Sequence, residues 1–133
     1  LYAVSARIVP HTQTCVGHVP SILFGDILTY IRSAISGILY IAPVANINPG
    51  RQYPSMFEPI HGSAPYIAGK GIANPIGAIW AGALILEHLV LRELHDRILG
   101  AIERVVAAGS VRTPYLGGNA TTNEVADAIA REI

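Results

Sequence analysis

The stretch FEPIHGSAPYIAGKGIANPIGAIW, Phe57–Trp80, decides how the rest of the chain is interpreted. A turn-rich loop, Asn46–Pro54, leads to an apolar strand pattern over Ser55–Ile60. A loop of small residues follows, and Asn74 with Pro75 then opens a long apolar helix. Small residues let the main chain approach a ligand closely, and free N–H groups at a helix start favour anionic or polar ligand atoms. The stretch therefore predicts a backbone-lined ligand loop that leads into a helix.

The composition limits the class of protein. Hydrophobic residues make up 51% of the 133 residues and charged residues 14%, whereas charged residues reach about 25% in an ordinary soluble domain. We expect one segment, residues 1–133, without an internal domain boundary. Some of its apolar surface should meet another chain segment or a subunit of a homo-oligomer. Nine basic and nine acidic residues give a net charge of zero, so a nucleic-acid partner is not expected.

Three features concern the cellular setting. Cys15 is the only cysteine, so no internal disulfide can form, and we expect a buried, inert thiol and a cytoplasmic location. The sequence begins at Leu1 without a Met and without a basic-then-apolar leader, which indicates a piece of a longer protein and no signal peptide. The uncharged run 71–86 is shorter than the roughly 20 apolar residues of a bilayer span. It predicts a buried helix, and no membrane partner is expected.

Apolar residues three and four apart predict a helix over Leu23–Ile38, with Ser21 as its N-cap. Asp26 and Tyr30 are four residues apart, so they share one face of this helix. Upstream we expect two further elements, the end of a helix over Leu1–Val9 and a short strand over Cys15–Val19.

The helix that follows Asn74 runs to Leu89 and contains Gly77 and Gly82. Each glycine costs about 1 kcal/mol against Ala in a helix, so we expect both to permit close packing. Two more helices are predicted: an amphipathic one over Arg92–Ala108 with Gly109 as its C-cap, and a last one capped by Thr121 or Thr122, with Glu124 in its first turn.

The segment NINPGRQYPSMFEPIHGSAPYIAGKGIANPIGAIW resembles the cofactor loop of the metal-dependent, NAD(P)-linked β-decarboxylating dehydrogenases. This family includes isocitrate, isopropylmalate and tartrate/D-malate dehydrogenases, and Asn-Ile-Asn-Pro with Pro-Ser-Met-Phe is most similar to the tartrate/D-malate branch. LFGDIL, Leu23–Leu28, resembles the family's metal-ligand helix, and RTPYLGGNATTNEV, Arg112–Val125, resembles its C-terminal end. The resemblance implies an α/β, isopropylmalate-dehydrogenase-like fold, here a C-terminal portion with a few strands and about four or five helices.

The resemblance also implies a site for the adenosine end of the cofactor. A planar imidazole can stack on the adenine, and a glycine leaves room for backbone N–H groups on the phosphates. Without the resemblance, the same segment is interpreted as an ordinary strand–loop–helix connection with His61 as an interior group. The length of the match to the family favours the cofactor loop instead. No G-x-G-x-x-G fingerprint follows a strand, so a Rossmann site is not expected. The candidate residues are Glu58, His61, Gly62, Ser63, Ala64, Tyr66, Ile67 and Asn74.

Three tyrosines stand where the resemblance implies aspartates. The resemblance implies NAD as the cofactor. Tyr66 replaces the Asp that would accept both ribose hydroxyls and disfavour a 2′-phosphate, so NADP is not excluded. Tyr30 and Tyr2 replace two of three metal ligands, which leaves Asp26 as the metal contact. Mg²⁺ and Mn²⁺ prefer several carboxylate oxygens, so the metal site is expected to be impaired.

No catalytic residue is assigned, because the family's catalytic Tyr and Lys and its substrate-binding arginines lie upstream of the matched part. Lys70, the only lysine, is expected to be an exposed loop charge. Ser63 lacks the partners for nucleophilic catalysis. His88 and His95 are seven residues apart and predict a surface pair on one helical side, not a metal site.

Two functions follow from these observations. The first is a segment of an NAD(P)-dependent oxidoreductase that oxidatively decarboxylates a 2-hydroxy diacid of the tartrate, malate or isopropylmalate type. The second is a truncated or degenerate relative that retains the fold core, a possible cofactor half-site and a self-association surface, and that catalyses nothing.

Overall fold

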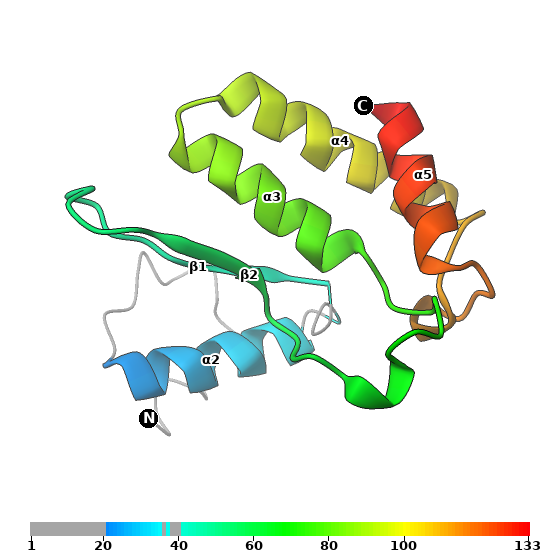
Figure 1. Ribbon diagram of the computed structural model, residues 1–133, viewed down its shortest axis with the longest axis horizontal. Coiled ribbons are helices and arrows are strands. Elements are labelled where there is room, and N and C mark those ends of the chain that lie inside the picture. Colours follow the sequence, from blue (N-terminus) through cyan, green and yellow to red (C-terminus); the bar gives the residue numbers. More distant parts are fainter. Residues whose placement is uncertain (1–20, 36, 38–40) are drawn as a thin grey trace. The chain divides into compact units, whose positions relative to one another are not determined.

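The structure, a computed structural model, describes residues 21–35, 37 and 41–133 (Figure 1). Contacts group the chain into two units, residues 1–39 and 40–133, and each unit is described by itself. The predicted helix end at Leu1–Val9 and strand at Cys15–Val19 lie outside the described residues. A single segment without an internal boundary stays a prediction.

In the first unit, helix α2 (Ile22–Ile35) forms where the apolar spacing predicted a helix, and it stops three residues before the expected end. Ser21 directly precedes it, and the Ser21 carbonyl accepts a hydrogen bond of 2.8 Å from the Gly25 N–H. Leu28 is buried, whereas Leu23 is 66% exposed. Part of the apolar surface of α2 is therefore exposed to solvent.

The second unit begins with a two-stranded antiparallel sheet, β1 (Pro43–Asn46) and β2 (Met56–Pro59), in which Val44 pairs with Glu58. The connecting loop is organised by Asn48, as its turn chemistry predicted. The Asn48 side-chain oxygen accepts from the Gly50 N–H over 3.1 Å, and the Asn48 N–H donates to the Ser55 hydroxyl over 3.0 Å.

Helices α3 (Ile76–His88), α4 (Arg92–Ala108) and α5 (Thr122–Glu132) supply the core of this unit. In Figure 1, α3 and α4 run side by side, and the strand pair lies along the other side of α3. Trp80 is partly buried against the core. The buried core residues are Ile76, Ala101, Ile102, Val105, Val125 and Ile129.

The two glycines of α3 differ in role. A Cβ at Gly77 would lie 3.3 Å from the Ile41 carbonyl oxygen and 3.3 Å from the Pro59 Cβ, so the predicted close packing is confirmed there. A Cβ at Gly82 would meet no atom of the described residues within 4 Å. The same prediction is therefore wrong for Gly82 as far as the described part of the chain goes, because no element in that part approaches the position.

The helix ends follow known capping patterns. Gly109 ends α4 in the left-handed region at φ 65°, as predicted. After α3, the Val90 N–H donates to the Glu87 carbonyl and the Leu91 N–H donates to the Leu86 carbonyl, each over 2.9 Å. This pair of bonds is a Schellman motif. Val90 occupies its left-handed position at φ 66°, where glycine is usual.

Thr121 is the N-cap of α5, which settles the choice between Thr121 and Thr122. Its hydroxyl accepts from the Glu124 N–H, and the Glu124 carboxylate accepts from the Thr121 N–H. The two residues thus form a capping box. Hydrogen bonding to the Thr121 N–H, and then to the Thr121 hydroxyl, lowers the pKa of Glu124 below its usual range, because both bonds favour the carboxylate.

Candidate functional site

The loop that leaves β2 contains one 3-10 turn and three residues with a left-handed backbone. The 3-10 turn η2 (Pro65–Ile67) starts after Ala64, whose backbone is left-handed at φ 42° and ψ 61°. For a residue other than glycine, this conformation costs about 1–2 kcal/mol. Gly69 and Gly71 are also left-handed, at φ 75° and 64°, and there glycine is the residue that fits. Strain of this kind at Ala64 is common at ligand sites.

A hollow of about 870 Å³ lies against this loop. Seven of the eight candidate cofactor residues line it, and only Glu58 does not, because it lies on β2 opposite Val44. The seven are His61, Gly62, Ser63, Ala64, Tyr66, Ile67 and Asn74. The loop therefore brings its candidate residues together around one concave surface.

The other wall of the hollow comes from a distant part of the sequence. Tyr115 lies in the 3-10 turn η3 (Pro114–Leu116), and Thr122 and Asn123 lie in the first turn of α5. None of the three was a candidate from the sequence. The polar Thr122-Asn123 pair at a helix start was a visible signal, but it does not reveal which loop it meets.

Two hydrogen bonds from Thr122 connect the two walls of the hollow. Its N–H donates to the Gly71 carbonyl over 2.8 Å, and its hydroxyl donates to the Ala73 carbonyl over 2.6 Å. The far end of the loop is thus tied to the start of α5.

Asn74 lies where the loop enters α3. Its side-chain oxygen accepts a bond of 3.0 Å from the Ile76 N–H, which supports the start of the helix. Its Nδ2 is buried and has no hydrogen-bond partner among the described residues. An unpaired buried donor costs about 1–3 kcal/mol, so an acceptor that reached Asn74 Nδ2 would be bound favourably.

The His61 ring is partly buried at the opposite end of the loop. Its Nδ1 lies 3.0 Å from the Gly62 carbonyl oxygen and donates to it, because a carbonyl oxygen can only accept. A Cβ at Gly77 would lie 3.7 Å from His61 Nε2. The absence of a side chain at Gly77 therefore lets the imidazole sit close to the first turn of α3.

The described lining of the hollow contains no permanently charged side chain. Among its described lining residues there is no Lys, Arg, Asp or Glu. Tyr66 is 75% exposed and Tyr115 is 47% exposed. Lys70 is exposed, as predicted, and it is not among the lining residues. Anion binding here would depend on hydroxyls and backbone N–H groups.

The candidate metal contact, Asp26, lies in α2 with Tyr30 one turn later. Tyr2 lies outside the described residues. Among the side chains that the structure describes, which do not include that of Asp26, no three His, Cys, Asp or Glu are grouped closely enough to hold a metal ion.

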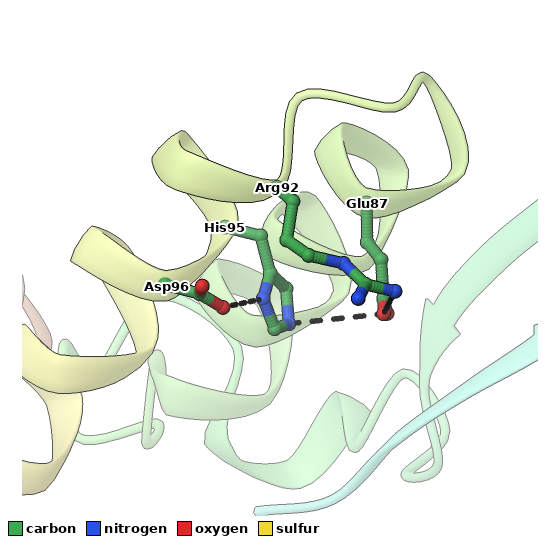
Figure 2. Close-up of polar contacts among 4 residues, drawn as sticks. All are labelled: Glu87, Arg92, His95 and Asp96. Carbon is green, nitrogen blue, oxygen red and sulfur yellow. Dashed lines mark hydrogen bonds and ion pairs between the residues drawn. The ribbon is translucent and has the colours of Figure 1, made fainter.

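A second polar cluster lies between the end of α3 and the start of α4 (Figure 2). His95 Nδ1 lies 2.8 Å from Asp96 Oδ1, and His95 Nε2 lies 4.0 Å from Glu87 Oε2. His88 instead packs its ring on Phe57, with the centroids 5.4 Å apart. His88 and His95 do not share one helical side, because His88 belongs to α3 and His95 to α4.

Comparison with known proteins gives the ancestry. The model of the family described as isocitrate/isopropylmalate dehydrogenase matches residues 8–129. The chain belongs to this family.

Relatives within the isocitrate/isopropylmalate dehydrogenase family indicate the branch. The chain is 51% identical over 131 residues to a probable tartrate dehydrogenase/decarboxylase of Bacillus subtilis, covering 98% of this chain and 37% of that protein. It is 54% identical over 120 residues to the D-malate dehydrogenase [decarboxylating] of Escherichia coli, covering 86% of this chain and 33% of that protein. The tartrate/D-malate branch expected from the sequence is confirmed. The chain spans about a third of the length of these relatives.

Solved structures agree on the fold. A β-decarboxylating dehydrogenase from Thermococcus kodakarensis, in its apo form, superimposes with a TM-score of 0.83 at 38% identity, covering 98% of this chain and 38% of that one. An isocitrate dehydrogenase from Methylococcus capsulatus gives a TM-score of 0.82 at 36% identity, with the same coverage of both chains. The α/β fold of the family, present as a portion, is therefore confirmed. Within the described part of the chain, no helix has both the length and the apolar character that crossing a membrane requires.

Proposed function

We propose that the chain carries the adenosine half-site of an NAD(P)-dependent dehydrogenase that oxidatively decarboxylates a 2-hydroxy diacid of the tartrate or malate type. The observation that supports it most is the hollow, which gathers seven of the eight candidate residues on one loop. The names of the most similar relatives support the class of substrate. When bound, the cofactor would supply the nicotinamide that accepts a hydride from the substrate.

The lining is suited to a nucleotide. The partly buried His61 imidazole offers a flat surface for an adenine. The Ser63 hydroxyl and the N–H groups of the small-residue loop offer donors to phosphate oxygens. Asn74 Nδ2 offers a donor that has no other partner among the described residues. Glu58 lies outside the described lining, and we propose that it acts at the edge of the site.

The neutral lining bears on the choice of cofactor. A cationic side chain would favour the 2′-phosphate of NADP, and a carboxylate would repel it. The described lining has neither, and the exposed Tyr66 phenol brings one neutral oxygen. We therefore propose that both NAD and NADP bind, with similar affinity.

The metal site fits less well. Asp26 remains the proposed contact for Mg²⁺ or Mn²⁺, and Tyr30 one turn later offers a phenol in place of a carboxylate. Hard divalent cations bind several carboxylate or carbonyl oxygens, and the described residues contain no cluster of that kind. No step of the reaction is assigned to a metal on these residues.

A direct binding experiment tests the half-site. NADH and NADPH are each titrated into the purified chain while the nicotinamide fluorescence is recorded. The proposal expects saturable binding of both, and the exposed loop variant Gly50→Ala, remote from the hollow lining, should bind equally well. Absence of a saturable change with either nucleotide would overturn it.

The second candidate is a non-catalytic relative that keeps the fold core. Tyr30 in α2 favours it, because a phenol there weakens the metal site on which the family's chemistry depends. An assay with Mn²⁺, NAD or NADP, and tartrate, D-malate or isopropylmalate decides between the two. Product formation above that of a Tyr66→Ala, Gly62→Val double variant would rule out the non-catalytic reading.

We also propose that the protein acts in the cytoplasm as a homo-oligomer. Exposed apolar side chains on α2, such as Leu23 at 66% and Ile35 at 51%, support self-association. Sedimentation of the purified chain tests it, and a concentration-independent monomer would contradict it.

A further inference from the structure

The loop between β2 and α3, residues 60–75, is held near its C-terminal end by hydrogen bonds from outside the loop. Within the described residues, the hydrogen bonds that tie the carbonyls of residues 71–73 to a distant part of the chain both come from Thr122. The last turn bond inside the loop is the one of 3.1 Å from the Lys70 N–H to the Ile67 carbonyl. Gly69 and Gly71 make this end of the loop pliable, because glycine restricts the backbone least. An external restraint is therefore needed to keep its shape.

Thr122 is attached to a rigid support. The capping box of Thr121 and Glu124 fixes the first turn of α5. Val125 and Ile129 are 2% and 1% exposed, and both belong to the core that α5 shares with α3 and α4. The backbone of Thr122 is thus held by the core through α5.

The residues that Thr122 holds belong to the wall of the hollow. Gly71 and Ala73, whose carbonyls accept its two bonds, both line it, and so do Thr122 itself and the neighbouring Asn123. Movement of residues 71–73 away from α5 would separate the two walls. It would also move Asn74, whose side chain supports the start of α3.

We propose that Thr122 is a positioning residue that keeps the wall at residues 71–73 in the form that binds the nucleotide; the ligand in this statement rests on the proposed function. A ligand that needs one loop conformation binds more weakly when that conformation is less populated, in proportion to its population. Removal of the hydroxyl bond should lower this population without unfolding the chain.

Three variants test the role. Thr122→Val keeps the shape and the backbone N–H bond to Gly71 but removes the hydroxyl donor, whereas Thr122→Ser retains the donor. Thr29→Val makes the same hydroxyl-to-methyl change in α2, where the hydroxyl donates to its own helix at Gly25 over 2.9 Å. Circular dichroism at the assay temperature establishes that each variant is folded.

The first measurement uses no ligand. Amide hydrogen exchange over residues 62–74 should be at least about threefold faster in Thr122→Val than in the wild type, as expected for loss of one hydrogen bond of ordinary strength. Thr122→Ser and Thr29→Val should match the wild type. Unchanged exchange in Thr122→Val would overturn the positioning role, whatever the nucleotide does.

The second measurement is the dissociation constant for NADH. Thr122→Val should weaken binding by about threefold or more, and Thr122→Ser should restore it. A purely structural role would lower the melting temperature of Thr122→Val and leave the dissociation constant of the folded protein unchanged, which would overturn the inference. Failure of the wild type to bind NADH or NADPH would overturn the proposed function instead. The hydrogen-exchange data would then still test whether Thr122 restrains the loop.

Discussion

Thr121 and Glu124 form two reciprocal hydrogen bonds across the first turn of α5. The Thr121 N–H donates to Glu124 Oε2 over 2.7 Å, and the Glu124 N–H donates to Thr121 Oγ1 over 3.3 Å. Thr121→Ala removes the hydroxyl half of this box and should cost about 1 kcal/mol of unfolding free energy. Urea denaturation measures the loss. Thr121→Ser should recover most of it, and equal stability of the Ala variant and the wild type would contradict the role of the cap.

The same pair predicts a dependence of stability on pH. The Thr121 N–H, and then its hydroxyl, lowers the pKa of Glu124 in the folded chain, so the carboxylate stabilises the fold above the ordinary glutamate pKa of about 4.3. This contribution is lost as the pH falls through the lowered folded pKa. The melting temperature of the wild type should exceed that of Glu124→Gln at pH 7, and the difference should shrink steadily below pH 4. A difference that grows on acidification would contradict the assignment.

Gly62 should matter for binding and not for folding. A Cβ there would meet no atom of the described residues within 4 Å, and the position lines the hollow. Gly62→Ala is therefore expected to leave stability unchanged or raise it by about 0.4–1 kcal/mol, and to weaken NADH binding because the methyl group occupies ligand space. Gly77→Ala is the contrasting variant, since its Cβ would press on Ile41 and Pro59 at 3.3 Å. It should lose stability, and tight NADH binding by Gly62→Ala would count against the hollow as the site.

The backbone of Val90 is in a left-handed conformation that is strained for valine and unstrained for glycine. It holds φ 66° after α3 while 74% of it is exposed, so Val90→Gly relieves about 1–2 kcal/mol of strain against an entropy cost of about 0.5–1 kcal/mol. A net gain in unfolding free energy is expected from urea titration. Leu89→Gly, one residue earlier at φ −82°, has no such strain to relieve and should be destabilising. The same sign for both variants would refute the explanation.

Tyr66 should control the choice between the two cofactors. Tyr66→Asp brings a carboxylate to the exposed, neutral wall of the hollow, where it can accept from ribose hydroxyls and repel a 2′-phosphate. The ratio of the NADPH and NADH dissociation constants should rise severalfold relative to the wild type. Tyr66→Asn, similar in size and uncharged, is the control and should change this ratio little. An unchanged ratio in Tyr66→Asp would remove Tyr66 from the ribose subsite.

The sequence predicted best those elements whose signals are local. The bounds of α4 are those expected, because its apolar spacing and Gly109 together define it. The loop after β2 was located by its small residues and by its resemblance to the family's cofactor loop, and the structure gathers most of its candidates around the hollow. The end of α2 was placed three residues late, because Ile38 continues the apolar spacing beyond Gly37, and Gly37, left-handed at φ 70°, was not taken as the stop signal.

What the sequence missed depends on contacts between distant residues. Thr122 meets Ala73 across 49 residues, and no periodicity or motif specifies that pairing. Gly77 and Gly82 are alike in sequence, and only the approach of Ile41 and Pro59 makes one of them necessary for packing. A spacing of seven would place His88 and His95 on one side of a single helix, but the Schellman turn at Val90 separates α3 from α4.

The bond between Thr122 and Ala73 also sets an order of events in time. A ribosome adds about 5–20 residues per second, so the 49 residues between the two partners take roughly 2–10 seconds to make at that rate. During this interval the nascent loop has neither its far wall nor its restraint. The hollow can therefore close only after the start of α5 has been synthesised.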